Sequence, residues 1–150
     1  MTPELEAFQG MPERSFEAGK VLVSEGHRTG VLYILKEGAV EVLKGRMSIN
    51  EIRSAGSVFG EISILLDRPH MASIKVLEPS IFFVAENPKE FLLANPEVSL
   101  NVARLLAMRL NHVTNYLVDL KRQFSSEESH LGMVDEVLEE LLHHQRGPSS

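Results

Sequence analysis

The 150-residue sequence contains no cysteine, which excludes disulfides, thiol nucleophiles and cysteine metal sites. Basic residues are also in the minority: 15 Lys and Arg stand against 21 Asp and Glu, for a formal net charge of −6. A broad basic face that follows a phosphate backbone is therefore not expected. We predict no nucleic-acid partner.

Long apolar runs are missing as well. No stretch approaches the roughly 20 apolar residues that a membrane-spanning helix needs, and the N-terminal segment carries early acidic residues instead of a basic stretch followed by an apolar one. We expect a cytoplasmic protein that makes no membrane contact. A hydrophobic content of 43% over 150 residues is sufficient for one domain with a buried core.

Short apolar segments separated by glycines dominate from about Glu13 to Val84. This rhythm is typical of an antiparallel sandwich or barrel. Two β-rich runs, 31–35 and 39–43, flank Lys36-Glu37-Gly38, which predicts a hairpin whose glycine takes a positive φ. Further strands are expected at 20–23, 49–52, 74–77 and 81–85.

Beyond Asn87-Pro88 the apolar period changes from two to about 3.5. Because proline is favoured in the first turn of a helix, we predict a short helix from Pro88 to Leu93 and a long one from Pro96. Apolar residues of the long helix recur at alternating spacings of four and three, which indicates a narrow heptad seam that meets another helix. The seam consists of Leu106, Leu110, Val113, Leu117, Leu120 and Phe124.

The segment from Phe59 to Ser73 reads Phe-Gly-Glu-Ile-Ser-Ile-Leu-Leu-Asp-Arg-Pro-His-Met-Ala-Ser. A glycine lets the backbone approach a ligand closely, and the backbone N–H groups that follow it suit an anionic phosphate. The segment resembles the phosphate-binding cassette of cyclic-nucleotide-binding domains, which reads Gly-Glu, a short apolar turn and Pro-Arg-x-Ala-Ser/Thr. The family pattern is matched at Gly26, Gly38, Gly60, Glu61 and Ala72.

The resemblance covers about Phe16 to Phe124 and implies the fold of the catabolite activator family and of kinase regulatory subunits. That fold is α+β: an eight-stranded antiparallel β jelly roll with a short cassette helix, a hinge helix and a long C-terminal helix. We expect a cyclic-nucleotide-binding-like domain over 1–124, with a dimerisation helix at about 96–124. A short amphipathic helix, placed at 134–144 after a break at Ser125 to Ser129, and a loose tail are expected within 125–150.

The implied ligand is cAMP or cGMP, with no cofactor and no metal. The resemblance gives Glu61 a hydrogen bond from the ribose 2′-hydroxyl and gives Ser73 one to the phosphate or the nucleobase. A solvated turn carboxylate and a solvent-facing strand hydroxyl are the alternatives for these two residues. The expected ligand-binding residues are Gly60, Glu61, Ile62, Ser63, His70, Met71, Ala72 and Ser73.

His70 stands where the family has arginine. Arginine offers a permanent charge and a planar fork for two phosphate oxygens, whereas imidazole, with an ordinary pKa of about 6.5, is mostly neutral at pH 7. Loss of a charge-assisted contact costs about 1.5–3 kcal/mol, or one to two decades of affinity. Three interpretations stay open: an empty site, weak nucleotide binding with help from Arg68, or a site tuned to another small anion. The alternative for Arg68 is an exposed cation at a loop tip.

Similar bacterial regulators continue past the long helix into a winged helix-turn-helix module. Residues 125–150 are too few for one, and their charges are mainly acidic. We therefore expect a stand-alone regulatory module that forms a homodimer through the seam and signals to a protein partner through its hinge and long helix, and not a DNA-binding transcription factor. The alternatives are a seam that packs on its own sandwich and a ligand-free dimeric scaffold.

An enzyme is not expected, and no catalytic residues are assigned. A jelly-roll metal site of cupin type would need two or three histidines and a carboxylate converging from strands. The histidines fall mostly in loops or helices without a His-x-His pair on a strand, and no nucleophile elbow is present. They are His27, His70, His112, His130, His143 and His144.

Overall fold

The computed structural model describes residues 3–124 and 128–143. The chain forms two compact units, Met1–Val102 and Ala103–Ser150. In chain order the elements are η1 (Pro3–Phe8), β1 (Glu13–Phe16), β2 (Val21–Val23), β3 (Leu32–Glu37), β4 (Val40–Lys44), β5 (Met47–Ile52), β6 (Val58–Phe59), α1 (Glu61–Leu66), β7 (Ser73–Val76), β8 (Ser80–Ala85), α2 (Pro88–Ala94), α3 (Pro96–Gln123) and α4 (Glu128–His143).

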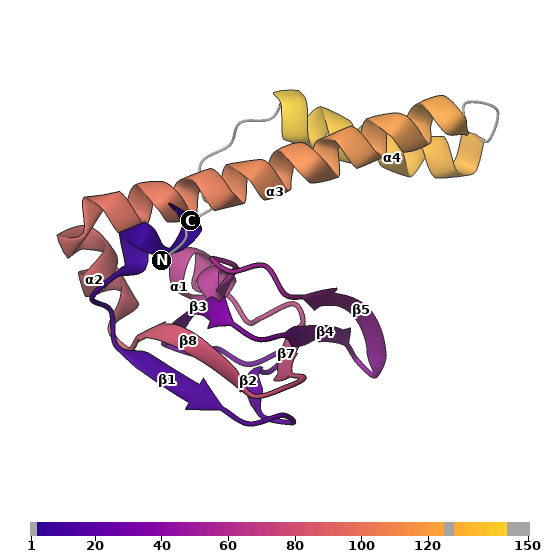
Figure 1. The fold of residues 1–150 in the computed structure, drawn as a ribbon. Coiled ribbons are helices and arrows are strands. Elements are labelled where there is room, and N and C mark those ends of the chain that lie inside the picture. Colours follow the sequence, from indigo (N-terminus) through magenta and orange to yellow (C-terminus); the bar gives the residue numbers. More distant parts are fainter. Residues whose placement is uncertain (1–2, 125–127, 144–150) are drawn as a thin grey trace. The chain divides into compact units, whose positions relative to one another are not determined.

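Two four-stranded antiparallel sheets make up most of the first unit (Figure 1). Their strand orders are β1-β8-β3-β6 and β2-β7-β4-β5. Buried residues from both sheets share one apolar cluster, as expected of a β-sandwich. In the part of the chain that the structure describes, the predicted eight antiparallel strands are confirmed, while the jelly-roll connectivity stays a prediction.

The predicted hairpin between residues 31–35 and 39–43 is wrong. β3 pairs with β8 and β6, whereas β4 pairs with β5 and β7, so the two strands belong to different sheets. Gly38 does have a positive φ, 120°, but there the chain crosses from one sheet to the other. The sequence pattern identified the two strands and the turn between them. It could not assign them to one sheet, because apolar residues of both strands can pack into the same core from opposite sheets. The tight hairpin lies one connection later, where Lys44 pairs with Met47.

Phe82 of β8 lies at the centre of the core and is fully buried. Its ring meets three other aromatic rings edge-on, with centroids 5.8 Å from Phe16, 6.1 Å from Tyr33 and 6.4 Å from Phe59. Edge-to-face contacts at these distances add about 0.5–1.5 kcal/mol each to the burial of the rings. Side-chain contacts thereby tie β1, β3 and β6 to β8, and β1 and β3 also pair with β8 along the strands.

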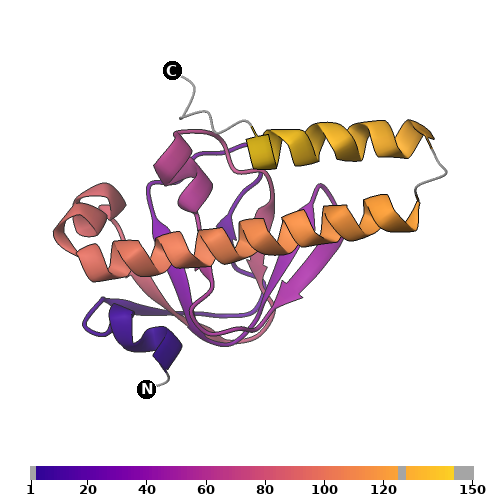
Figure 2. The ribbon, with the colours of Figure 1, turned by 90° about the horizontal axis from the view of Figure 1, so that it is seen from above.

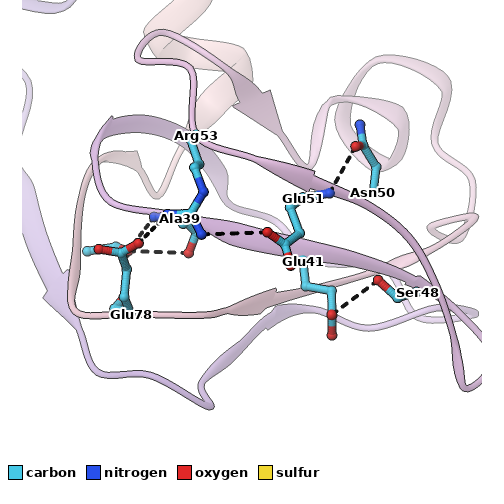
Figure 3. Close-up of polar contacts among 8 residues, drawn as sticks. Ala39, Glu41, Ser48, Asn50, Glu51, Arg53 and Glu78 are labelled. Atoms are coloured by element: carbon cyan, nitrogen blue, oxygen red, sulfur yellow. Dashed lines mark hydrogen bonds and ion pairs between the residues drawn. The ribbon is translucent and has the colours of Figure 1, made fainter.

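The β4–β5 hairpin carries a pair of like charges, Glu41 and Glu51, directly opposite each other. Like charges in this position destabilise a sheet unless other groups offset them. Figure 3 shows that each carboxylate has a donor: Arg53 forms an ion pair with Glu51, and the Ser48 hydroxyl donates to Glu41 at 3.1 Å. Arg53 also donates to Glu78, which links the end of β5 to the connection before β8.

The two helices α2 and α3 begin at the prolines from which their starts were predicted. α2 starts at Pro88 and α3 at Pro96, and Val98 and Val102 of α3 are buried. α4 begins at Glu128, six residues before the predicted start, so Ser129 lies inside the helix instead of in a break. The rest of the predicted break, residues 125–127, and the predicted helix end at 144 lie outside the described residues. Among the described residues, no helix has the length and apolar character needed to cross a bilayer.

In the second unit, α4 runs antiparallel beside α3 (Figure 2). An ion pair joins Lys121 of α3 to Asp135 of α4. Leu138 of α4 is buried, with 8% of its surface exposed. Within this unit the two helices form a helical hairpin, which the Lys121–Asp135 ion pair and the burial of Leu138 help to hold together.

Candidate functional site

α1 is preceded by Gly60, which has a φ of 92°. A Cβ on this residue would lie 2.6 Å from the carbonyl oxygen of Val31, closer than any side chain tolerates. Glycine is therefore required twice, for its positive φ and for the close approach of the Val31 backbone. As a result, the first turn of α1, which starts at Glu61, is held directly against the loop before β3.

The middle of α1 faces inward. Ser63 is buried, and its hydroxyl donates a hydrogen bond of 3.2 Å to the carbonyl oxygen of Thr29. Ile62 is half-buried and Ile64 is buried. The Ser63 side chain, predicted to bind ligand, thus has a partner within the protein in this structure.

His70 is buried, with 5% of its surface exposed. Its ring Nε2 and the Thr29 hydroxyl share a hydrogen bond of 2.8 Å. Burial lowers the pKa of the imidazole, the nearby Glu61 carboxylate partly offsets this effect, and His27 adds to it. The lowered pKa keeps the ring mostly neutral at pH 7, so the cassette has no permanent charge at the position of the family's arginine.

The end of the cassette is anchored mainly through its backbone. Met71 is 68% exposed, and its carbonyl accepts a hydrogen bond of 2.8 Å from Lys44. Ala72 is half-buried. The Ser73 hydroxyl accepts a hydrogen bond of 2.9 Å from the backbone N–H of Glu25, which leaves its own proton available to a second partner.

Glu25 connects three segments around the cassette. Besides the bond from its N–H to Ser73, its carboxylate accepts a hydrogen bond of 2.8 Å from the N–H of Gly45 and lies 3.6 Å from the Lys44 ammonium. The loop after β2, the tip of the β4–β5 hairpin and the start of β7 are thereby joined. Glu25, Thr29 and Lys44 were not predicted from the sequence, because their partners lie far along the chain and no local pattern marks them.

A cavity of about 470 Å³ opens beside the cassette, between the loop after β2 and α2. It includes Thr29 and Ser63 but neither Glu61 nor His70, so only part of the predicted site lines it. Arg68, the second candidate cation, is exposed, which agrees with the alternative of an exposed cation and not with a role at the ligand. The cavity is lined by Arg28, Thr29, Gly30, Ser63, Ile64, Asp67, Glu86, Asn87, Pro88, Lys89 and Glu90.

Within residues 3–124 and 128–143, no group of three or more His, Asp or Glu side chains is arranged to hold a metal ion. The polar groups around α1 and His70 include hydroxyls, backbone N–H groups, the His70 imidazole and the Glu61 carboxylate. Such a set suits hydrogen bonding to an anionic, hydroxyl-bearing molecule.

Comparison with known proteins supplies the family. The model of the cyclic nucleotide-binding domain matches residues 13–91, slightly more than half of the chain. A cAMP-dependent protein kinase regulatory subunit from Yarrowia lipolytica is 27% identical over 76 residues, which cover 51% of this chain and 20% of that protein. A CRP-like cAMP-activated global transcriptional regulator from Mycobacterium tuberculosis is 28% identical over 111 residues, which cover 70% of this chain and half of the regulator.

Solved structures agree on the fold. A cyclic nucleotide-binding domain from Methylobacillus flagellatus superposes with a TM-score of 0.61 at 24% identity, over 73% of this chain and 67% of that one. The chain spans at most half the length of the two curated relatives named above. The similarity therefore lies in one domain of those proteins.

Proposed function

This chain belongs to the cyclic nucleotide-binding domain family, and on that premise we propose that it is a regulatory module that binds cAMP or cGMP at the cassette around α1. The observation that carries the proposal is the start of α1. The family match includes the whole segment, and Gly60 has the φ and the close backbone contact that only glycine permits.

The proposed ligand contacts follow from the groups present. The backbone N–H groups at Ile62 and Ser63 face the cyclic phosphate, and Glu61 accepts a hydrogen bond from the ribose 2′-hydroxyl. Ser73 donates the proton that its bond from Glu25 leaves available. Gly60, Met71 and Ala72 shape the site through their backbone.

His70 is the proposed cationic partner of the phosphate, in its protonated form. Because burial lowers its pKa, the ring gains its proton only below the ordinary value of about 6.5, unless a bound anion favours it. Nucleotide binding is therefore weak at neutral pH and improves on acidification. Arg68 is exposed and takes no part in this assignment.

We propose that the module acts as a homodimer and not as an enzyme. Three seam residues, two on α3 and one directly after it, are exposed in the single chain: Leu110 to 49%, Val113 to 47% and Phe124 to 39%. Leu106, Leu117 and Leu120 are half-buried. An apolar stripe of this kind is suited to pair with the same stripe of a second copy. Nucleotide binding would then change how the dimer meets a protein partner in the cytoplasm.

The experiment is isothermal titration of the chain with cAMP and with cGMP, in the wild type and in Glu61→Gln. Saturable binding that weakens roughly tenfold in Glu61→Gln supports the site, since the variant loses one charge-assisted hydrogen bond. Glu37→Gln, on β3, serves as the matched control. Equal affinities in all three proteins would contradict the assignment, and the absence of binding to the wild type at pH 6 favours the ligand-free scaffold.

A further inference from the structure

Thr29 is bonded to the cassette through both its side chain and its backbone. The hydroxyl shares the 2.8 Å hydrogen bond with Nε2 of His70, and the carbonyl oxygen accepts the 3.2 Å hydrogen bond from Ser63. Thr29 itself is half-buried. One residue of the loop after β2 therefore holds both α1 and the imidazole at the far end of the cassette.

The backbone of His70 is fixed independently of its ring. Its N–H donates to the carbonyl oxygen of His27 at 2.9 Å, and its carbonyl accepts from the N–H of Gly26 at 2.9 Å. These two bonds fasten the backbone at residue 70 to the same loop that carries Thr29. What remains adjustable is the side chain, and the Thr29 hydroxyl is the partner that occupies Nε2.

This arrangement opposes the use of His70 as a partner for an anion. The imidazole of a residue with only 5% of its surface exposed is favoured in its neutral form, and a neutral imidazole binds a phosphate more weakly than an imidazolium does. The charged groups that act on the ring are Glu61 on α1, which favours its protonation, and His27 on the loop, which disfavours it. An anionic ligand at the cassette must therefore compete with the contact to Thr29.

We propose that Thr29 is a positioning residue that holds Nε2 of His70 within the loop after β2 and so withholds the imidazole from an anionic ligand. The inference rests on the proposed function, because the ligand is the cyclic nucleotide assigned there. In this arrangement the affinity of the cassette for the nucleotide depends on the Thr29 hydroxyl, which lies 41 residues from His70 along the chain. The nucleotide phosphate and the Thr29 hydroxyl are alternative partners of the same ring.

The first test needs no ligand. Thr29→Val removes the hydroxyl at nearly constant shape and leaves the carbonyl that accepts from Ser63, while Thr29→Ser keeps the hydroxyl. NMR titration of the His70 ring protons is expected to give a higher midpoint pH in Thr29→Val than in the wild type. The reason is that a ring no longer held by the Thr29 hydroxyl becomes more exposed. Thr29→Ser is expected to match the wild type. Equal midpoints in all three proteins would overturn the proposal.

The second test is isothermal titration with cAMP at pH 7. Thr29→Val is expected to bind roughly two- to tenfold more tightly than the wild type, the factor that one neutral hydrogen bond supplies. This gain in cAMP affinity should vanish when Thr29→Val is combined with His70→Arg. Weaker binding in Thr29→Val would overturn the proposal, since it would mean that Thr29 presents the ring to the ligand. A raised midpoint without cAMP binding in any variant supports the Thr29 contact and overturns the proposed function instead.

Discussion

A Cβ on Gly38 would lie 2.0 Å from the hydroxyl oxygen of Ser80. The same hydroxyl accepts a hydrogen bond of 3.1 Å from the N–H of Ala39 and donates one of 2.7 Å to the carbonyl oxygen of Glu78. Ser80 is 2% exposed. The crossing from β3 to β4 is thus packed directly against the start of β8, where the two sheets meet.

This contact predicts a large cost for Gly38→Ala. Overpacking of a core typically costs about 1–3 kcal/mol, and the φ of 120° adds backbone strain, so we expect a loss of about 3 kcal/mol or more in the free energy of unfolding. Gly45→Ala is the control, because Gly45 also has a positive φ, 61°, but has nothing within 4 Å of its Cβ position. Urea unfolding measures both, and equal losses would show that the Ser80 contact contributes nothing.

His70 predicts a pH dependence of stability. Burial lowers its pKa in the folded chain below the ordinary 6.5, so the unfolded chain binds the proton more readily. The folded state is therefore most favoured above about pH 6.5, and stability falls as the pH drops from there through the lowered pKa. His70→Gln, which cannot titrate, should lose most of this decline between pH 7.5 and 5.5.

The control for this measurement is His112→Gln, on the exposed surface of α3. The free energy of unfolding, measured at several pH values for the three proteins, should decline with acidification in the wild type and in His112→Gln. An unchanged decline in His70→Gln would mean that other groups cause it.

The exposed seam of α3 predicts dimerisation that a charge abolishes. Leu110→Glu places a carboxylate in the middle of the stripe, and light scattering at about 50 μM should then change from a dimer mass to a monomer mass. Met108→Glu is matched to it, since Met108 is 67% exposed on the same helix but lies off the seam. A monomeric wild type, or dimers in both variants, would contradict the proposed interface.

Local features of the fold were predictable because each has a local cause. Pro88 and Pro96 begin helices where a missing N–H has no cost, and short runs of apolar, β-favouring residues mark β3 and β8. The partner of each strand was not predictable, since the run after Gly38 serves the core from either sheet. The start of α4 was predicted too late because the polar residues up to Ser129 were interpreted as a break, whereas Ser129 lies inside the 16-residue helix.

In the candidate site, too, local features were predictable from the sequence and contacts between distant segments were not. Gly60, Glu61 and His70 were recognised because they lie in one continuous motif. Thr29 was not recognised, because its hydrogen bond to His70 joins two loops and the two residues are 41 positions apart. No feature of the sequence around Thr29 indicates this bond. Only the folded chain shows that Ser63 and His70 already have partners, which is what makes ligand binding a competition.

The replacement of arginine by His70 is the feature on which the proposed function depends most. The measurement that tests it is isothermal titration with cAMP, at pH 8 and at pH 6, of the wild type and of His70→Arg. We predict weak wild-type binding at pH 8 that improves at pH 6, and binding by His70→Arg that is roughly 10- to 100-fold tighter than the wild type at pH 8 and insensitive to this pH change. The absence of cAMP binding by His70→Arg at both pH values would contradict the account.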